Sequence, residues 1–143
     1  MVDRLIGTRI ERKEDQRFLT GTGQYTDDIN VAGQCHGCFV RSPHAHARIR
    51  AIRTTRALKV RGVVAIYTGE DLAAAGIGGL PCGWLITDVN GQPMKEPPHP
   101  VLAQGKVRYV GDHVALVVAE TAEQARDAAE LVDVDYEVLP AVV

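Results

Sequence analysis

The sequence predicts an α/β (α+β) domain in which short helices pack on a mixed β-sheet. Three observations near its C-terminal end predict this class. Val114 to Ala119 is an unbroken apolar run of strand length. Thr121 and Gln124 have the spacing of a helix capping box. From Val132 to Val138 apolar and acidic residues alternate with the period of a strand. Strand, helix and strand follow one another almost without linkers, which is typical of layered domains.

Length and composition indicate one soluble globular domain with a short arm. Of the 143 residues, 45% are hydrophobic and 24% charged, and the formal net charge is −2. Because this balance gives no broad basic surface, neither nucleic acid nor a membrane is an expected partner. The first residues carry mixed charges without an apolar leader, and three cysteines cannot all pair within one chain. Both observations predict a cytoplasmic protein.

Residues 1–30 are predicted to form a charged N-terminal arm and turn, and residues 31–143 the folded domain. The apolar anchor of the arm is Phe18 with Leu19. The run Thr20 to Gly23 predicts a turn that leads into a strand. A phosphate-binding loop is the alternative, but the run is shorter than that motif and lacks the lysine and hydroxyl residue that complete it.

Residues 34–49 predict two strands separated by a bend. Pro43 lacks an amide donor, so this point must be an edge or a bulge. After the bend, polar residues alternate with small apolar ones, which predicts that His44, His46 and Arg48 share one strand face.

A short basic transition over residues 50–58 leads to an apolar strand over residues 60–67. Thr68 and Asp71 again have capping-box spacing and predict a short helix, which Gly76 ends. The second strand–helix pair resembles the first in pattern only.

Residues 76–100 predict an irregular loop, because glycine and proline are concentrated there. Asn90-Gly91 favours a tight hairpin turn, and the proline-rich run 96–100 favours extended backbone. Long irregular loops in compact domains are usually functional or order on assembly. We therefore expect this loop to be mobile in the isolated chain.

The C-terminal helix and strand each have one apolar face. The apolar positions of the helix are small, which allows close packing on a sheet: Ala125, Ala128, Ala129 and Val132. The strand alternates Val132, Val134, Tyr136 and Val138 with Asp133, Asp135 and Glu137, and ends at Pro140. We interpret the three carboxylates as an exposed face, since a catalytic acid–base pair needs a pocket that separates two pKa values.

Cys35-His36-Gly37-Cys38 has the spacing of a redox pair or half a zinc site. Redox pairs usually open a helix, whereas this motif precedes a predicted strand, on which the two sulfurs would diverge. A structural zinc site needs two more ligands, and Cys82 stands alone. The prediction is therefore buried, inert thiols.

His44 and His46 could supply two metal ligands, but no acidic partner stands at a recognisable spacing. Ser42, the only serine, lacks the surroundings of a nucleophile elbow. We predict instead that Arg41, His44, His46 and Arg48 form a polar contact surface.

Three separated segments resemble one family. They are residues 12–29 (RKEDQRFLTGTGQYTDDI), 39–49 (FVRSPHAHARI) and 107–140 (VRYVGDHVALVVAETAEQARDAAELVDVDYEVLP). They are similar to the N-terminal α/β-hammerhead domain of the large, molybdopterin-binding subunit of the molybdenum hydroxylases. That family includes xanthine dehydrogenases, aldehyde oxidases and aerobic carbon monoxide dehydrogenases. Its usual Gly-Gln-Pro is replaced here by Gly111-Asp112-His113, at a turn before a strand.

The resemblance implies a hammerhead domain over residues 31–143 that acts as a non-catalytic scaffold. Its parent enzyme is an oxidoreductase that hydroxylates a substrate carbon, or oxidises a small carbonyl-type substrate, at molybdenum. Molybdopterin, 2Fe-2S clusters and often FAD are its implied cofactors, none bound by this chain. The implied partners are the remaining molybdopterin-binding domains and the iron–sulfur and flavin subunits.

The family sequence continues past residue 143, so we expect a cloned fragment or a split-gene subunit that self-associates or needs a partner. The alternative is a free-standing interaction domain unrelated to molybdenum, which the adjoining coding region would distinguish. A third hypothesis, a thiol-redox or metal protein, rests on Cys35 and Cys38 alone, and metal analysis tests it.

Overall fold

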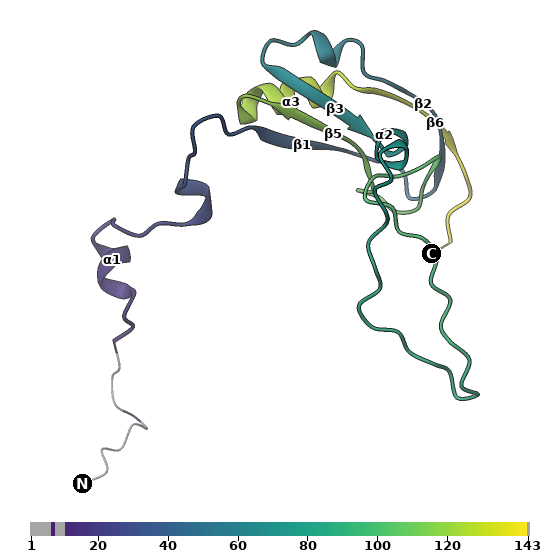
Figure 1. The fold of residues 1–143 in the computed structure, drawn as a ribbon, viewed down its shortest axis with the longest axis horizontal. Coiled ribbons are helices and arrows are strands. Elements are labelled where there is room, and N and C mark those ends of the chain that lie inside the picture. Colours follow the sequence, from purple (N-terminus) through teal and green to yellow (C-terminus); the bar gives the residue numbers. More distant parts are fainter. Residues whose placement is uncertain (1–6, 8–10, 143) are drawn as a thin grey trace. The chain divides into compact units, whose positions relative to one another are not determined.

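The computed structural model describes residue 7 and residues 11–142, and the chain divides into two compact units (Figure 1). The first unit contains residues 1–34 and the second residues 35–143. Both β-sheets belong to the second unit.

A short helix and a turn organise the first unit. Helix α1 spans Asp15–Leu19, and a 3-10 turn spans Thr26–Asp28. After α1 the chain turns through Gly21, whose φ of 72° is the left-handed conformation that glycine adopts readily. The predicted turn is therefore confirmed, but the element after it is the 3-10 turn and not the predicted strand. The rings of Phe18 and Tyr25 stack with centroids 5.6 Å apart, yet no residue of α1 is buried.

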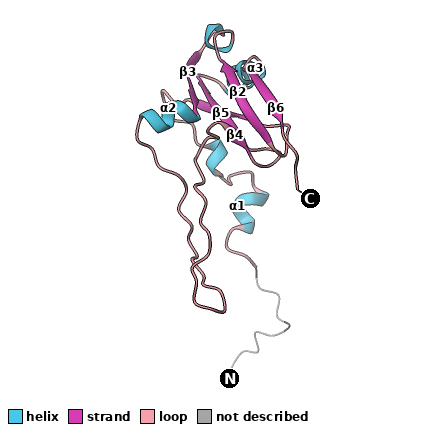
Figure 2. Cartoon of the chain, turned by 90° about the vertical axis from the view of Figure 1, so that its right-hand side faces the viewer, coloured by secondary structure: helices cyan, strands magenta, loops and turns pink. Residues whose placement is uncertain are grey.

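Two antiparallel three-stranded sheets form the body of the second unit among the residues described (Figure 2). The first contains, in spatial order, β1 (His36–Arg41), β5 (His113–Ala119) and β3 (Val63–Thr68). The second contains β4 (Lys106–Val107), β2 (Ala47–Arg53) and β6 (Asp133–Val138). Each pairing between these strands is antiparallel.

The predicted class, with short helices on β-structure, is confirmed, while the strands form two antiparallel sheets in place of one mixed sheet. The bend at Ser42-Pro43 sends the chain from β1 in the first sheet to β2 in the second. Helix α3 (Ala122–Glu130) likewise joins β5 to β6 across the two sheets. The predicted strand–helix–strand unit therefore links two sheets and is not a crossover between parallel neighbours.

Strand β5 is the centre of the first sheet because it is apolar on both faces. Val114 and Val117, three positions apart, point to opposite faces, and both are fully buried. Val114 packs in one core cluster with Ala47 and Val107. Val117 packs in the other with Ala128 of α3. One strand thus contributes to both cores.

Helix α3 begins at the predicted capping box. The Thr121 hydroxyl accepts from the Gln124 amide at 3.2 Å, and the Gln124 side chain accepts from the Thr121 amide at 3.1 Å. Ala125 and Ala128 are buried, as the small apolar face predicted. The predicted face of the following strand is wrong at Val138, which is 63% exposed, because the chain there leaves the core at the end of β6.

Replacing Thr121 with alanine is expected to lower the free energy of unfolding by about 1 kcal/mol, since the Gln124 amide loses its acceptor. Urea unfolding followed by circular dichroism measures this. Thr55→Ala, at an exposed turn residue, is the control and should be close to wild type. Equal losses in the two variants would contradict a capping role.

Helix α2 (Gly69–Ala74) also begins at its predicted capping box and ends before Gly76, which has φ +71°. The Asp71 carboxylate accepts from the Thr68 hydroxyl at 2.6 Å and from the Thr68 amide at 2.7 Å. These two hydrogen bonds, the hydroxyl first, lower the pKa of Asp71 below its ordinary value.

The lowered pKa of Asp71 predicts a loss of stability in acid. Its contribution is present above the ordinary aspartate pKa of about 4 and disappears as the pH falls through the lower folded value. In Asp71→Asn, unfolding free energy measured from pH 2 to 6 should therefore decline less steeply in this acid range. Asp127→Asn, at an exposed residue of α3, should keep the wild-type slope. An unchanged slope in Asp71→Asn would contradict the prediction.

Candidate functional site

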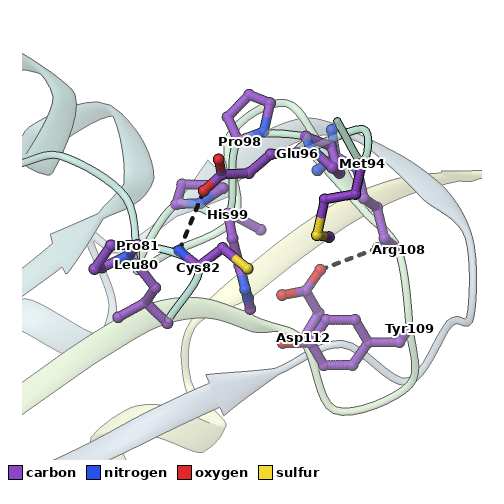
Figure 3. Close-up of a pocket in the computed structure, with 13 residues that line it drawn as sticks. Leu80, Pro81, Cys82, Met94, Glu96, Pro98, His99, Arg108, Tyr109 and Asp112 are labelled. Atoms are coloured by element: carbon purple, nitrogen blue, oxygen red, sulfur yellow. Dashed lines mark hydrogen bonds between the residues drawn. The ribbon is translucent and has the colours of Figure 1, made fainter. Parts of the chain in front are cut away.

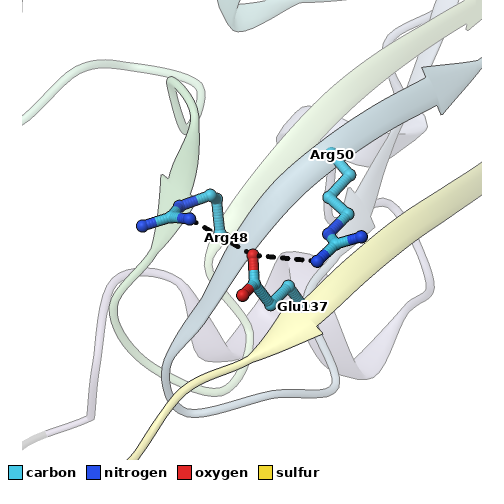
Figure 4. A network of polar contacts seen from close by, with 3 residues as sticks. All are labelled: Arg48, Arg50 and Glu137. Carbon is cyan, nitrogen blue, oxygen red and sulfur yellow. Dashed lines mark hydrogen bonds and ion pairs between the residues drawn. The ribbon is translucent and has the colours of Figure 1, made fainter.

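A ladder of ion pairs crosses the exposed face of the second sheet. Arg48 Nη1 and Arg50 Nη2 lie 3.3 and 3.4 Å from Glu137 Oε2, so two arginines of β2 hold one carboxylate of β6 (Figure 4). Arg53 Nη1 lies 2.9 Å from Asp133 Oδ2. We call these residues, together with Asp135, the β2–β6 ladder.

A β-bulge brings the three arginines to the same face. Ile49 is paired with Tyr136 and Ala51 with Asp135, so Arg50 is the extra residue of β2. In a regular strand, residues three apart point to opposite faces, so an exposed Arg50 would place Arg53 toward the core. In the structure Arg53 is exposed. The sequence analysis did not predict this arrangement, because it assigned residues 50–58 to a basic transition, whereas β2 continues to Arg53.

The ladder is a surface feature with a small effect on stability. Its side chains keep between 33% and 61% of their area exposed, and such pairs each contribute at most about 1 kcal/mol. The predicted exposed acidic face is found at Asp133 and Asp135, while Glu137 is half-buried. Each carboxylate faces an arginine, which is an arrangement for contact rather than for acid–base catalysis.

The structure does not place His44 and His46 along a strand, because β2 begins at Ala47. The predicted alternation of these histidines with Arg48 on one strand face is therefore wrong. Both lie in the bend between β1 and β2. The buried residue Ser42 stabilises this bend, because its hydroxyl accepts from the His44 amide at 3.0 Å and donates to the His44 carbonyl at 2.9 Å.

Arg41, His44, His46 and Arg48 each contact a different part of the second unit. Arg41 Nη1 donates to the Gly111 carbonyl at 3.3 Å, and His46 Nδ1 lies 2.6 Å from the Pro140 carbonyl oxygen. The His44 ring meets Tyr136 edge-on, with centroids 5.0 Å apart. These contacts order the four side chains, whose role as a contact surface stays a prediction.

The prediction of buried thiols is wrong for Cys35, which is exposed, whereas Cys38 is half-buried. The reason is the start of β1 at His36, which leaves Cys35 outside the sheet while Cys38 pairs with Val117 of β5. Among the residues that the structure describes, no group of three or more His, Cys, Asp or Glu side chains is placed to hold a metal ion.

A cavity of about 390 Å³ lies between the base of the 76–100 loop and the turn before β5 (Figure 3). The loop supplies mainly apolar groups, including Leu80, Met94 and several prolines. The turn supplies Arg108, Tyr109 and Asp112. The sequence analysis did not predict this cavity. The pattern that could have indicated it is the group of prolines at residues 97–100, which comes shortly before the turn at Gly111.

Asp112 holds the turn together and is only 8% exposed. Its carboxylate accepts from the Arg108 amide at 3.0 Å, and its carbonyl accepts from the Ser42 amide at 2.9 Å. Burial and then the charge of Asp112 raise the pKa of Tyr109. Tyr109 and Asp112 thus place polar groups on one wall of a cavity whose other wall is mainly apolar.

Comparison with known proteins identifies the family. The family model for the a/b hammerhead domain of aldehyde oxidase and xanthine dehydrogenase matches residues 20–140. The nicotine 6-hydroxylase large subunit of Paenarthrobacter nicotinovorans and the carbon monoxide dehydrogenase large chain of Afipia carboxidovorans are each 43% identical over 138 residues. The crystal structure of a Cu,Mo-CO dehydrogenase superposes with a TM-score of 0.77 and 41% identity over 96% of this chain.

The chain therefore belongs to the aldehyde oxidase and xanthine dehydrogenase hammerhead family, as its three sequence segments predicted. Residues 20–140 match that hammerhead domain, and 96% of the chain aligns with both relatives. The same alignments cover 16% of each relative, so the chain spans about one-sixth of their length.

The lining of the cavity does not fit an iron–sulfur cluster or a molybdenum ion. The thiol that lines it is that of Cys82, and the apolar lining of leucine, methionine and proline offers no further ligands of the kind that these groups need. Separately, no helix in the described part of the chain has the length and apolar character needed to cross a lipid bilayer.

Proposed function

We propose that the chain is the non-catalytic N-terminal scaffold domain of a molybdenum hydroxylase large subunit. The observation that supports this is the coverage of the alignments. Nearly all of this chain aligns with a relative named as a large subunit and with one named as a large chain, and each alignment covers about one-sixth of the relative's length. A domain with two closed cores and an exposed polar ladder suits such a supporting role.

The parent enzyme, in this proposal, is a cytoplasmic oxidoreductase of the xanthine dehydrogenase, aldehyde oxidase or CO dehydrogenase type. Its molybdopterin-bound molybdenum supplies the redox chemistry, and 2Fe-2S clusters, often with FAD, carry the electrons away. All of these groups belong to other domains or subunits. This chain contributes a rigid surface against which the molybdopterin-binding domains pack.

The proposed partners are the remaining domains of the large subunit and the iron–sulfur and flavin subunits. Arg41 and Arg48 are the exposed cations of the predicted polar contact surface, and His44 and His46 lie half-buried beside them. Their intramolecular contacts hold them in fixed positions, which lowers the entropy that a partner contact costs.

The test is recovery of the tagged chain from the cells that make it, followed by metal analysis of the eluate. Co-elution of a larger molybdenum-containing polypeptide is expected. Arg41→Ala with Arg48→Ala should reduce recovery, and Arg126→Ala, at an exposed site on α3, is the matched control. Recovery of the folded chain alone and metal-free would overturn the proposal and leave a free-standing interaction domain.

A further inference from the structure

The 76–100 loop, whose expected mobility in the isolated chain stays a prediction, is a hairpin that extends away from the two sheets (Figures 1 and 2). Its two sides are joined at the base by the Leu80 amide, which donates to the His99 carbonyl at 2.8 Å. Nearer the tip, the Met94 amide donates to the Ile86 carbonyl at 3.0 Å. A Cβ on Gly79 would stand 2.6 Å from the His99 carbonyl oxygen, so a glycine is needed for the sides to approach.

The tip of the hairpin is built around Asp88. Its carboxylate accepts from the Asn90 and Gln92 amides, each at 2.8 Å, and these backbone hydrogen bonds lower the pKa of Asp88. Gly91 has φ +76° and closes the predicted hairpin turn. The conformation of the tip is therefore defined by hydrogen bonds within residues 88–92.

The hairpin exposes a set of large apolar side chains. The set is Ile77, Leu80, Trp84, Leu85, Ile86, Val89 and Met94. Trp84 is 80% exposed and Val89 fully exposed. Large apolar residues gathered on one hairpin mark an interaction surface, since burying their apolar area is favourable.

The outer part of the hairpin, residues 77–94, carries almost no charge to direct it toward a charged partner, whereas Lys95, Glu96 and His99 lie on the returning side. Between Ile77 and Met94 the only ionisable acid or base is Asp88, besides the Cys82 thiol, and the Asp88 carboxylate is already held by backbone amides. Depletion of charge with tryptophan and methionine present is the composition of an interface core. Nucleic acid and anionic lipid both attract basic side chains, which this segment lacks.

We propose that the 76–100 loop docks in an uncharged, apolar groove on the molybdenum-binding remainder of the large subunit, with Trp84 as its central anchor. This inference rests on the proposed function. The matched relatives favour this occupant: nearly the whole chain superposes on a CO dehydrogenase chain, of which five-sixths lies outside the superposition. That remainder is the largest surface available to cover the hairpin in such a protein.

The cavity at the hairpin base extends the same surface. Leu80, Met94 and Pro97 line it beside Tyr109, together with the charged residues Glu96, Arg108 and Asp112. An apolar side chain of the partner groove can enter this cavity while Trp84 enters the groove. Reciprocal insertion of this kind is typical of the energetic centre of an interface.

Trp84 is the only tryptophan of the chain, so it reports directly on its own exposure. In the full chain alone, its fluorescence should be that of solvent-exposed indole and should be quenched by iodide nearly as efficiently as a free tryptophan derivative. A blue-shifted, unquenched emission that is independent of concentration would show Trp84 buried within this chain and would overturn the proposal.

Hydrogen–deuterium exchange then compares the chain alone with the chain recovered in its molybdenum-containing assembly. The peptide spanning residues 80–94 is expected to exchange at least about tenfold more slowly in the assembly. The double substitution Trp84→Ser with Leu85→Ser should weaken association at least about tenfold. Leu58→Ser, at an exposed leucine in the 3-10 turn before β3, is the control.

The outcomes separate this inference from the proposed function. Assembly with no protection of residues 80–94, and no effect of the double substitution, would overturn the docking while leaving the scaffold role intact. Failure to recover any molybdenum-containing partner would overturn the scaffold role itself. Protection that grows with the concentration of the chain alone, or with added phosphatidylglycerol vesicles, would replace the named occupant by a second copy or by lipid.

Discussion

Substituting Val117 with aspartate is expected to prevent the second unit from folding. Val117 is fully buried in the middle of β5, where it packs with Ala128, Val132 and Ala57. A carboxylate there would have no cation in its core cluster, and an uncompensated buried charge costs several kcal/mol. That cost is comparable with the whole stability of a typical domain, about 5–15 kcal/mol. Far-UV circular dichroism and urea unfolding measure the loss.

Val64→Asp is the matched control for this substitution. Val64 lies on β3, which neighbours β5 in the same sheet, but 59% of its surface is exposed. Its aspartate stays in water, so this variant should fold with a small change in unfolding free energy. A Val117→Asp variant with a wild-type urea midpoint would show that β5 is not the structural centre described above.

Gly69→Ala is expected to lower the unfolding free energy by about 1–2 kcal/mol. Gly69 is buried at the start of α2, and a Cβ there would overlap the carbonyl oxygen of Ala103 and press on the side chain of Gln104. Alanine favours a helix over glycine by up to about 1 kcal/mol. Overpacking against a backbone atom costs about 1–3 kcal/mol, so the clash prevails.

Gly78→Ala is the control, since no atom lies within 4 Å of the Cβ position there and the residue is only nine positions along the chain. Its unfolding free energy should differ from that of wild type by no more than about 0.5 kcal/mol. A stabilised Gly69→Ala chain would mean that helix propensity outweighs the contact with Ala103.

Local signals in the sequence predicted the elements whose cause is local. Both capping boxes, at Thr68 and Thr121, form as their spacing predicted, because each needs only residues within one turn. The apolar run at β5 predicted a strand buried on both faces, and the hammerhead fold followed from the three matching segments. Asn90-Gly91 likewise predicted the hairpin turn at Asp88.

Features that depend on distant segments were not predictable in the same way. The bulge at Arg50 is visible only in the register between β2 and β6, which lie far apart in the sequence. The exposure of Cys35 depends on which residue begins the pairing of β1 with β5. The division into two sheets follows from the paths of the Ser42 bend and of α3, and hydrophobic periodicity carries no information on either path.

The candidate site was predicted in part. The sequence marked residues 76–100 as an irregular loop that is functional or orders on assembly, but gave no means to see that Trp84 stands exposed on a hairpin. The cavity was missed because it needs Met94 and Tyr109, from separate segments, on facing walls. Arg41, His44, His46 and Arg48 remain predicted contact residues, each now with a known neighbour in the fold.

The late position of β5 in the chain has a consequence during synthesis on the ribosome. Neither β1 nor β3 has any strand partner except β5, and β2 pairs only with β4 and β6 among the residues described. A nascent chain that has emerged up to residue 100 therefore holds three strands with open edges and no sheet. Such edges can pair with other chains, so the period before residues 101–138 emerge is when this domain is most exposed to wrong strand pairing.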